Sequence, residues 1–211
     1  MRVCQLIERS TKLNMLNFVL KEVLQTIRES SGFQSVAIRL QENSDYPYFQ
    51  HIGFPEIFVR KEYTLNVKDK QGNLVLDADG APLVECMCGN VLKKRTNPQY
   101  QYFTKEGAFW TNSTTQLLEG LTEKEKREIG RTRNTCHNYG YESVALIPVH
   151  VAGEIVGLIQ MNDPRENMLT LEKIERYQLL ADKLGTVVFE ILQFFEKAAN
   201  ALRKESNLEY V

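Results

Sequence analysis

The sequence predicts an α+β fold: a central antiparallel β-sheet with helices on one face and long helices at both ends of the chain. Three observations carry this prediction. Residues 7–30 and 170–204 place apolar side chains at helical spacing. Residues 143–149 and 154–161 are apolar, strand-like and joined by a tight Ala-Gly turn. Helices at the ends with strands between them favour α+β layering over an alternating α/β order.

In the first half of the chain, the N-terminal helix is expected to stop at the Ser-Ser-Gly of residues 30–32. Strands follow over residues 36–40 and 48–52. A short helix over residues 54–62 has proline in its first turn, where proline is tolerated. Turn signals on either side of residues 74–76 predict a hairpin that leads into the segment of Cys86. We expect no internal repeat.

In the second half, residues 93–115 are aromatic and irregular, which is typical of an insert beside a ligand pocket. Residues 122–130 predict a polar helix that Thr122 caps. Asp163 and Pro164 end the second strand of the pair, and the C-terminal helix follows.

The C-terminal helix carries apolar residues in heptad steps, a spacing that favours helix–helix pairing. These residues include Tyr177, Ala181, Leu184, Val188 and Ile191. A helix of about 35 residues runs roughly 50 Å, which is longer than one small domain can cover. We therefore expect a homodimer through the terminal helices, with residues 1–30 for packing, 31–169 as the sensor core and 170–211 as a signalling helix.

The bulk properties exclude two classes of partner. The formal net charge of −1 argues against a nucleic-acid surface, which requires a basic excess. No window reaches the roughly 18 apolar residues that cross a bilayer, so we expect no membrane partner. The sequence favours a cytoplasmic protein, in which cysteines are reduced or metal-bound rather than bridged.

Three of the four cysteines are in short polar stretches that predict loops: Cys86, Cys88 and Cys136. Cysteines in apolar runs are usually small core residues, whereas thiols in loops are available for chemistry. We therefore expect the fold to bring these three sulfurs together at one pocket. Cys4, near the start of the chain, is treated as incidental.

Residues 140–149 (Gly-Tyr-Glu-Ser-Val-Ala-Leu-Ile-Pro-Val) and 153–160 (Gly-Glu-Ile-Val-Gly-Leu-Ile-Gln) resemble the strand pair of GAF domains, the small-ligand sensing modules of signalling proteins. Residues 85–91, 109–113 and 131–136 resemble GAF domains found beside PAS domains and histidine kinases. The resemblance implies a sensor in a two-component system whose pocket lies between the sheet and the insert. A histidine kinase or another output domain would be its partner. The cyclic-nucleotide motif of phosphodiesterase GAF domains is not visible.

The first functional hypothesis is a metal or cofactor site. Thiolates are soft donors that suit zinc, copper(I) and iron–sulfur clusters, and a cysteine thiolate can also hold heme iron. Cys86, Cys88 and Cys136 supply three ligands, one short of a closed structural site. His137, adjacent to Cys136, is the candidate for the fourth.

Three alternatives remain open. In the first, Cys136 forms a reversible disulfide with Cys86 or Cys88, and the cationic neighbours Arg131 and Arg133 favour its thiolate. In the second, the chain is an enzyme that resembles the GAF-fold free methionine-(R)-sulfoxide reductases, with Cys136 as nucleophile and Cys88 and Cys86 as its partners. In the third, the cysteines are structural and the pocket binds an organic ligand. The candidate residues for that ligand are Trp110, Asn112, Ser113, Phe109 and His51.

Overall fold

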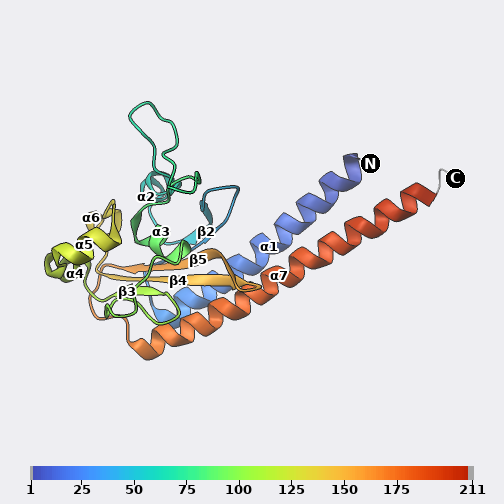
Figure 1. Cartoon of the computed structure of the whole chain (residues 1–211). Coiled ribbons are helices and arrows are strands. Elements are labelled where there is room, and N and C mark those ends of the chain that lie inside the picture. The colour runs from blue at the N-terminus through green and yellow to red at the C-terminus, as the bar shows by residue number, and fades with distance from the viewer. Residues whose placement is uncertain (1, 209–211) are drawn as a thin grey trace.

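A five-stranded antiparallel sheet, with strand order β2-β1-β5-β4-β3, separates two layers of helices (Figure 1). The coordinates are a computed structural model, which describes residues 2–208 and the side chains of residues 10–191, 193 and 194. The strands are β1 (Ser35–Leu40), β2 (Tyr48–Ile52), β3 (Phe109–Thr111), β4 (Ser143–Val151) and β5 (Glu154–Asp163). The predicted α+β fold with an antiparallel sheet is confirmed, although helices cover both faces of the sheet and not one (Figure 1).

The two faces of the sheet follow from the alternation of side chains along each strand. On β5, Ile159 and Met161 belong to the apolar core on one face. Leu158 belongs to the core on the other face, and the next positions on that face are the buried polar residues Gln160 and Asn162. The central strand therefore presents hydrocarbon to one layer and amide groups to the other.

The first layer consists of the long helices α1 (Arg2–Ser31) and α7 (Leu171–Leu208). Their fully buried residues, such as Leu20, Leu24 and Ala181, pack with Ile159 in the core below the sheet. Both helices continue beyond the sheet side by side, so the two chain ends lie at the same end of the molecule (Figure 1). None of the helices within residues 2–208 is long and apolar enough to pass through a bilayer.

The second layer is made of short helices. They are α2 (Glu56–Lys61), α3 (Cys86–Leu92), α4 (Thr114–Gly120), α5 (Glu123–Ile129) and α6 (Thr135–Asn138). The sequence predicts α2 and α5, and the side chain of Thr122 caps α5 as expected, in a reciprocal capping box with Glu125. It misses α3, α4, α6 and the edge strand β3. Elements of three to seven residues carry too little periodicity to stand out.

The arm, residues 64–85, projects from the second layer (Figure 1). The hairpin turns predicted on either side of residues 74–76 are confirmed by antiparallel bridges from Lys68 to Leu74 and from Leu76 to Pro82, and a third segment, not predicted, returns to pair with the first. Three segments close on one another through backbone hydrogen bonds from Val67 N to Leu83 O (2.8 Å), from Val75 N to Val67 O (2.9 Å) and from Leu83 N to Val75 O (2.8 Å). These residues are spaced eight apart, so the chain does contain an internal repeat, contrary to expectation. Asp69 and Asp77 cap its two turns in the same way.

Gly185 sets the distance between α7 and the sheet. It is buried, and a Cβ atom at this position would clash with the backbone carbonyl oxygen of His150 at the end of β4. We expect Gly185→Ala to lower the free energy of unfolding by about 1–3 kcal/mol, because backbone on both sides must shift. Urea denaturation measures the change.

The matched control for this prediction is Gly120→Ala, at the end of α4. A Cβ there meets no atom within 4 Å. Because alanine is the better helix former, Gly120→Ala should leave stability unchanged or raise it by up to about 1 kcal/mol. Equal stability of the Gly185→Ala variant and the unmodified chain would show that the close approach of α7 is not needed.

Candidate functional site

All three predicted cysteines line one small cavity, which we call the thiol cavity. Cys86 and Cys88 come from α3 and Cys136 from α6, segments 48 positions apart in the sequence at their nearest cysteines. The cavity has a volume of about 80 Å³. The expectation that the fold gathers these sulfurs is confirmed, although they lie on short helices and not in loops.

Most of the remaining wall is hydrocarbon. It includes Phe109, Leu117, Leu121, Ile129, Val144 and Leu146, with the thioether of Met87 as a further sulfur. The polar groups among the lining residues include the carboxylate of Glu62 and the ring of His137. A mostly apolar wall with a few polar groups is the usual composition of a small-molecule site.

The start of α3 is held in an unusual backbone conformation. Cys86 has a φ angle of 70°, in the left-handed region that side chains other than glycine rarely adopt. Its N–H donates to the carbonyl oxygen of Arg131 (3.0 Å), which ties α3 to the segment leading into α6. Further along α3, Gly89 lies so near the carbonyl of Val84 that a Cβ would come within 2.8 Å of its oxygen. Strained backbone of this kind is often found at functional sites.

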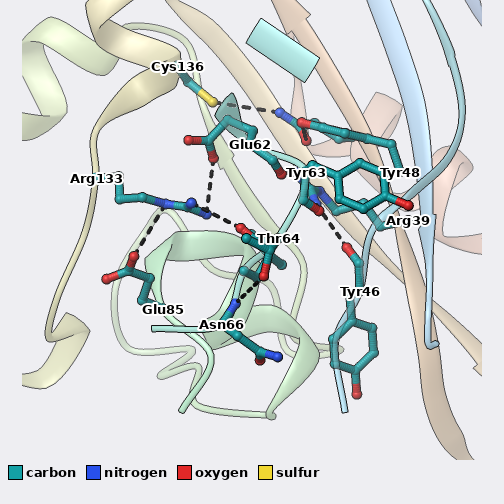
Figure 2. A network of polar contacts seen from close by, with 12 residues as sticks. Arg39, Tyr46, Tyr48, Glu62, Tyr63, Thr64, Asn66, Glu85, Arg133 and Cys136 are labelled. Atoms are coloured by element: carbon teal, nitrogen blue, oxygen red, sulfur yellow. Dashed lines mark hydrogen bonds and ion pairs between the residues drawn. The ribbon is translucent and has the colours of Figure 1, made fainter. Parts of the chain in front are cut away.

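Arg133 joins the chain segments that carry the cysteines (Figure 2). Its guanidinium forms ion pairs with Glu62 (Nη2 to Oε2, 3.2 Å) and Glu85 (Nε to Oε1, 3.5 Å). Its Nη1 donates a hydrogen bond to the carbonyl oxygen of Thr64 (3.0 Å). Glu62 and Glu85 are almost fully buried; Arg133 is the ion-pair partner of Glu62, and Glu85 is shared between Arg133 and the more exposed Arg131.

Cys136 rests against amide groups of the central strand. Gln160 Nε2 is 3.6 Å from the Sγ atom of Cys136, and Gln160 Oε1 accepts a hydrogen bond from the hydroxyl of Tyr48 (2.9 Å). Asn162 is fully buried next to this contact, and its Nδ2 has no hydrogen-bond partner among the described residues. Two amide donors therefore lie close to one sulfur.

Arg39 is a buried cation that the sequence interpretation did not single out. It is fully buried, its Nη1 donates to the carbonyl oxygen of Tyr46 (2.8 Å), and its guanidinium stacks 3.6 Å from the centre of the Tyr48 ring. Its hydrogen bonds go to backbone carbonyl oxygens, and within the described residues no hydrogen bond or ion pair joins it to a carboxylate. The available signal was an arginine at an alternating position in an otherwise apolar strand, residues 35–40.

Burial favours the protonated thiol at Cys136 and Cys88. Burial raises the pKa of Cys136 to about 12, and the proximity of Cys86 adds to this rise. Burial also raises the pKa of Cys88 well above its ordinary value, although the charge of Arg39 opposes the change. The expectation that Arg131 and Arg133 favour the Cys136 thiolate is wrong, because both arginines pair with carboxylates.

The other predicted site residues fall into three places. Phe109 and His137 line the thiol cavity, and His137 Nδ1 lies 3.2 Å from the hydroxyl of Thr114. Trp110, Asn112 and Ser113 line a separate groove of about 400 Å³. The amide group of Asn112 is engaged by the backbone of Leu169, and the Ser113 hydroxyl donates to Glu142. His51 lies on β2 in a third depression, outside the thiol cavity.

In the part of the chain that the structure describes, no group of three or more His, Cys, Asp and Glu side chains is arranged to hold a metal ion. The three cysteines are free thiols. Any shared ligand would therefore require the sulfurs to move closer together than they are here.

Neither the descriptions of known protein families nor the curated proteins produce a match to this sequence. Solved structures do match. A GAF domain/HD domain protein from Geobacter sulfurreducens is similar with a TM-score of 0.54 at 15% identity, over 86% of this chain and 96% of that one. A domain of a protein described as a two-component sensor histidine kinase from Sinorhizobium meliloti 1021 is similar with a TM-score of 0.53 at 12% identity, over 85% and 94%.

A type II free methionine-R-sulfoxide reductase from Thermoplasma acidophilum is also similar, with a TM-score of 0.54 at 12% identity over 85% of this chain and 95% of that one. The chain therefore has the GAF fold. Signalling modules and an enzyme both use this fold, so the choice between them depends on the site.

The ion pairs of Arg133 generate a prediction. Arg133→Gln leaves Glu62 buried without its ion-pair partner, while Glu85 keeps only Arg131, and we expect a loss of about 3 kcal/mol in the free energy of unfolding. Urea denaturation at neutral pH measures this loss.

The control is Arg131→Gln, which removes the other arginine that pairs with Glu85. The Arg131 side chain is 66% exposed, so its ion pair with Glu85 is screened by water and the expected loss is below about 1 kcal/mol. Equal losses in the two variants would contradict the role assigned to Arg133.

Proposed function

We propose that this chain is the sensory GAF domain of a signal-transduction protein, and that the thiol cavity receives the signal. The observation that carries the proposal is the convergence of Cys86, Cys88 and Cys136 on a single cavity from two distant segments. The resemblance to GAF domains beside histidine kinases makes such a kinase, or another output domain, the expected partner.

The volume of the thiol cavity favours a small ligand. Sites for organic ligands and cofactors usually measure about 300–1,000 Å³. The thiol cavity measures about 80 Å³, so heme does not fit it as it stands. Three sulfurs are also one short of the four that usually hold an iron–sulfur cluster. A single soft ion such as zinc or copper(I), or oxidation of two thiols to a disulfide, suits this space better.

The relay to the output is proposed to run through the terminal helices of a homodimer. Several large apolar side chains on α1 and α7 are exposed in the single chain, including Phe18 (67%), Leu179 (58%) and Met15 (44%). Covering such side chains stabilises an interface between helices. A change of packing at the cavity would shift the balance between two arrangements of these helices.

The test uses the reduced chain, purified without oxygen. Bound metal is measured by elemental analysis, and the protein is then treated with zinc, with copper(I) or with peroxide. The effective treatment should raise the free energy of unfolding, by about 2.7 kcal/mol for a ligand at a hundred times its Kd. It should also change self-association in sedimentation velocity.

Cys136→Ser should abolish both responses, and Cys4→Ser, which leaves the thiol cavity intact, should keep them. A chain that takes up no metal, and whose stability and self-association ignore all three treatments, would refute the proposal.

A second candidate is a reductase of free methionine sulfoxide, favoured by the amide donors that face Cys136. In this reaction the Cys136 sulfur attacks the sulfoxide sulfur, which leaves a thioether and a sulfenic acid on Cys136. Cys86 or Cys88 then displaces water from the sulfenic acid to form a disulfide, and an external thiol reduces that disulfide. The raised pKa of Cys136 opposes this candidate, because the thiolate is the nucleophile.

For this candidate we expect no turnover. The measurement is consumption of free methionine-(R)-sulfoxide by the reduced chain with excess thiol reductant, from pH 7 to pH 9. Sustained turnover that disappears in Cys136→Ser and survives in Cys4→Ser would make the protein an enzyme and overturn the expectation.

A further inference from the structure

Among the mostly buried groups around the thiol cavity, cations and carboxylates are equal in number without the thiols. Arg39 and Arg133 are the two cations, and Glu62 and Glu85 are the two carboxylates. Arg39 lies near Cys88, and its charge opposes the rise in the pKa of that thiol. Arg131 also pairs with Glu85 (Nε to Oε2, 2.7 Å), but its side chain is 66% exposed, so water screens its charge. A ligand that brings net charge into this region would therefore be buried without a counter-charge, which is costly.

The donor atoms also limit the ligand. The cavity offers three thiol sulfurs within a mostly hydrocarbon wall. The remaining nitrogen candidate, His137, has Nδ1 within 3.2 Å of Thr114 Oγ1 and 3.5 Å of Thr115 Oγ1, which leaves Nε2 as its possible ligand atom. Structural zinc sites are almost always four-coordinate, so three sulfurs alone do not complete one. An element that completes its bonding with three sulfurs, and holds a lone pair in the fourth position, matches this set better.

We propose that the thiol cavity binds a trivalent thiophilic metalloid, arsenic(III) or antimony(III), delivered as its neutral trihydroxide. This inference rests on the proposed function of the cavity as the site that receives the signal. Three S–H bonds and three metalloid–oxygen bonds break, three metalloid–sulfur bonds and three O–H bonds form, and three water molecules leave. No electron is transferred, and no charge is created or buried.

Other soft ions do not form a neutral complex with three thiolates. Three thiolates with a divalent ion leave a net charge of −1 in the cavity, and with a monovalent ion a net charge of −2. A buried excess of charge is unfavourable unless a further cation compensates it. The neutral condensation allows all three thiols to become ligands together without adding charge to the cavity.

The geometry requires a local closure. The three sulfurs are not at metal-binding distances in the structure, within the residues described. The side chains of Cys86 and Cys136 are only partly buried. Cys86 is the first residue of α3, and Cys136 lies on the one-turn helix α6. Rotation about the Cα–Cβ bond moves each sulfur between staggered positions without moving the backbone. Cys88 is buried, so its sulfur would stay in place while the sulfurs of Cys86 and Cys136 rotate toward it.

The test is a titration of the full chain with sodium arsenite, with zinc as the competing ion. We expect one arsenic per chain, and a mass gain in native mass spectrometry of one arsenic atom less three hydrogen atoms. X-ray absorption should show three arsenic–sulfur bonds, and arsenite should bind at least tenfold more tightly than zinc.

Cys86→Ser and Cys136→Ser should each weaken arsenite binding at least tenfold, and Cys4→Ser should not. Circular dichroism confirms that each variant is folded. Two arsenic–sulfur bonds instead of three, equal binding by Cys136→Ser, or a preference for zinc would overturn the inference.

The outcomes also separate this inference from the proposed function. If zinc, copper(I) or oxidation changes stability and self-association while arsenite binds no better than to Cys136→Ser, the inference fails and the sensory function stands. If arsenite binds through three sulfurs while arsenite, zinc, copper(I) and peroxide all leave self-association unchanged, the ligand assignment stands and the sensory function fails.

Discussion

The candidate site depends on the ion pairs and the hydrogen bond that the Arg133 guanidinium forms. This guanidinium connects Glu62, the carbonyl of Thr64 at the start of the arm and Glu85 at its end (Figure 2). Its side chain is only 22% exposed, so the ion pairs are shielded from water and stronger than surface pairs. Cys86 follows Glu85 directly, and Cys136 follows Arg133 by three residues. The ion pairs of Arg133 therefore hold the two segments that carry the cysteines in a defined relative position. This position does not depend on the conformation of the projecting part of the arm.

The central strand β5 connects the thiol cavity with the long helices. On one face, Gln160 contacts Cys136 and Tyr48, and on the other, Ile159 and Met161 pack in the core shared with α1 and α7. A rearrangement at Cys136 thus has a short physical route to the helices that leave the domain. The strand is buried on both faces, and close-packed surroundings transmit displacement because they contain few voids.

Elements with a clear local signal were predictable, and several short ones without such a signal were not. Strand β2 is found at its expected residues, and α7 was expected within a few residues of its ends, because alternating and periodic patterns are local properties of the chain. The short helices α2 and α5 were predicted from proline in the first turn and from the cap at Thr122. Helices α3, α4 and α6 are too short to show a periodic pattern in the sequence. They form where the chain packs over the sheet. The eight-residue repeat of the arm is difficult to recognise in the sequence, because only Val67, Val75, Leu83 and the turn residues recur at this spacing.

The sequence by itself determined the α+β layering, the GAF-type strand pair and the identity of the three thiols, because each follows from neighbours along the chain. The tertiary structure alone decided that the thiols share a cavity of about 80 Å³, that Arg133 serves two carboxylates and that Arg39 is buried beside Cys88. It also decided that burial, and not the adjacent arginines, sets the protonation of Cys136. Charge pairing and desolvation depend on distances across the fold, and residues far apart in the sequence set those distances.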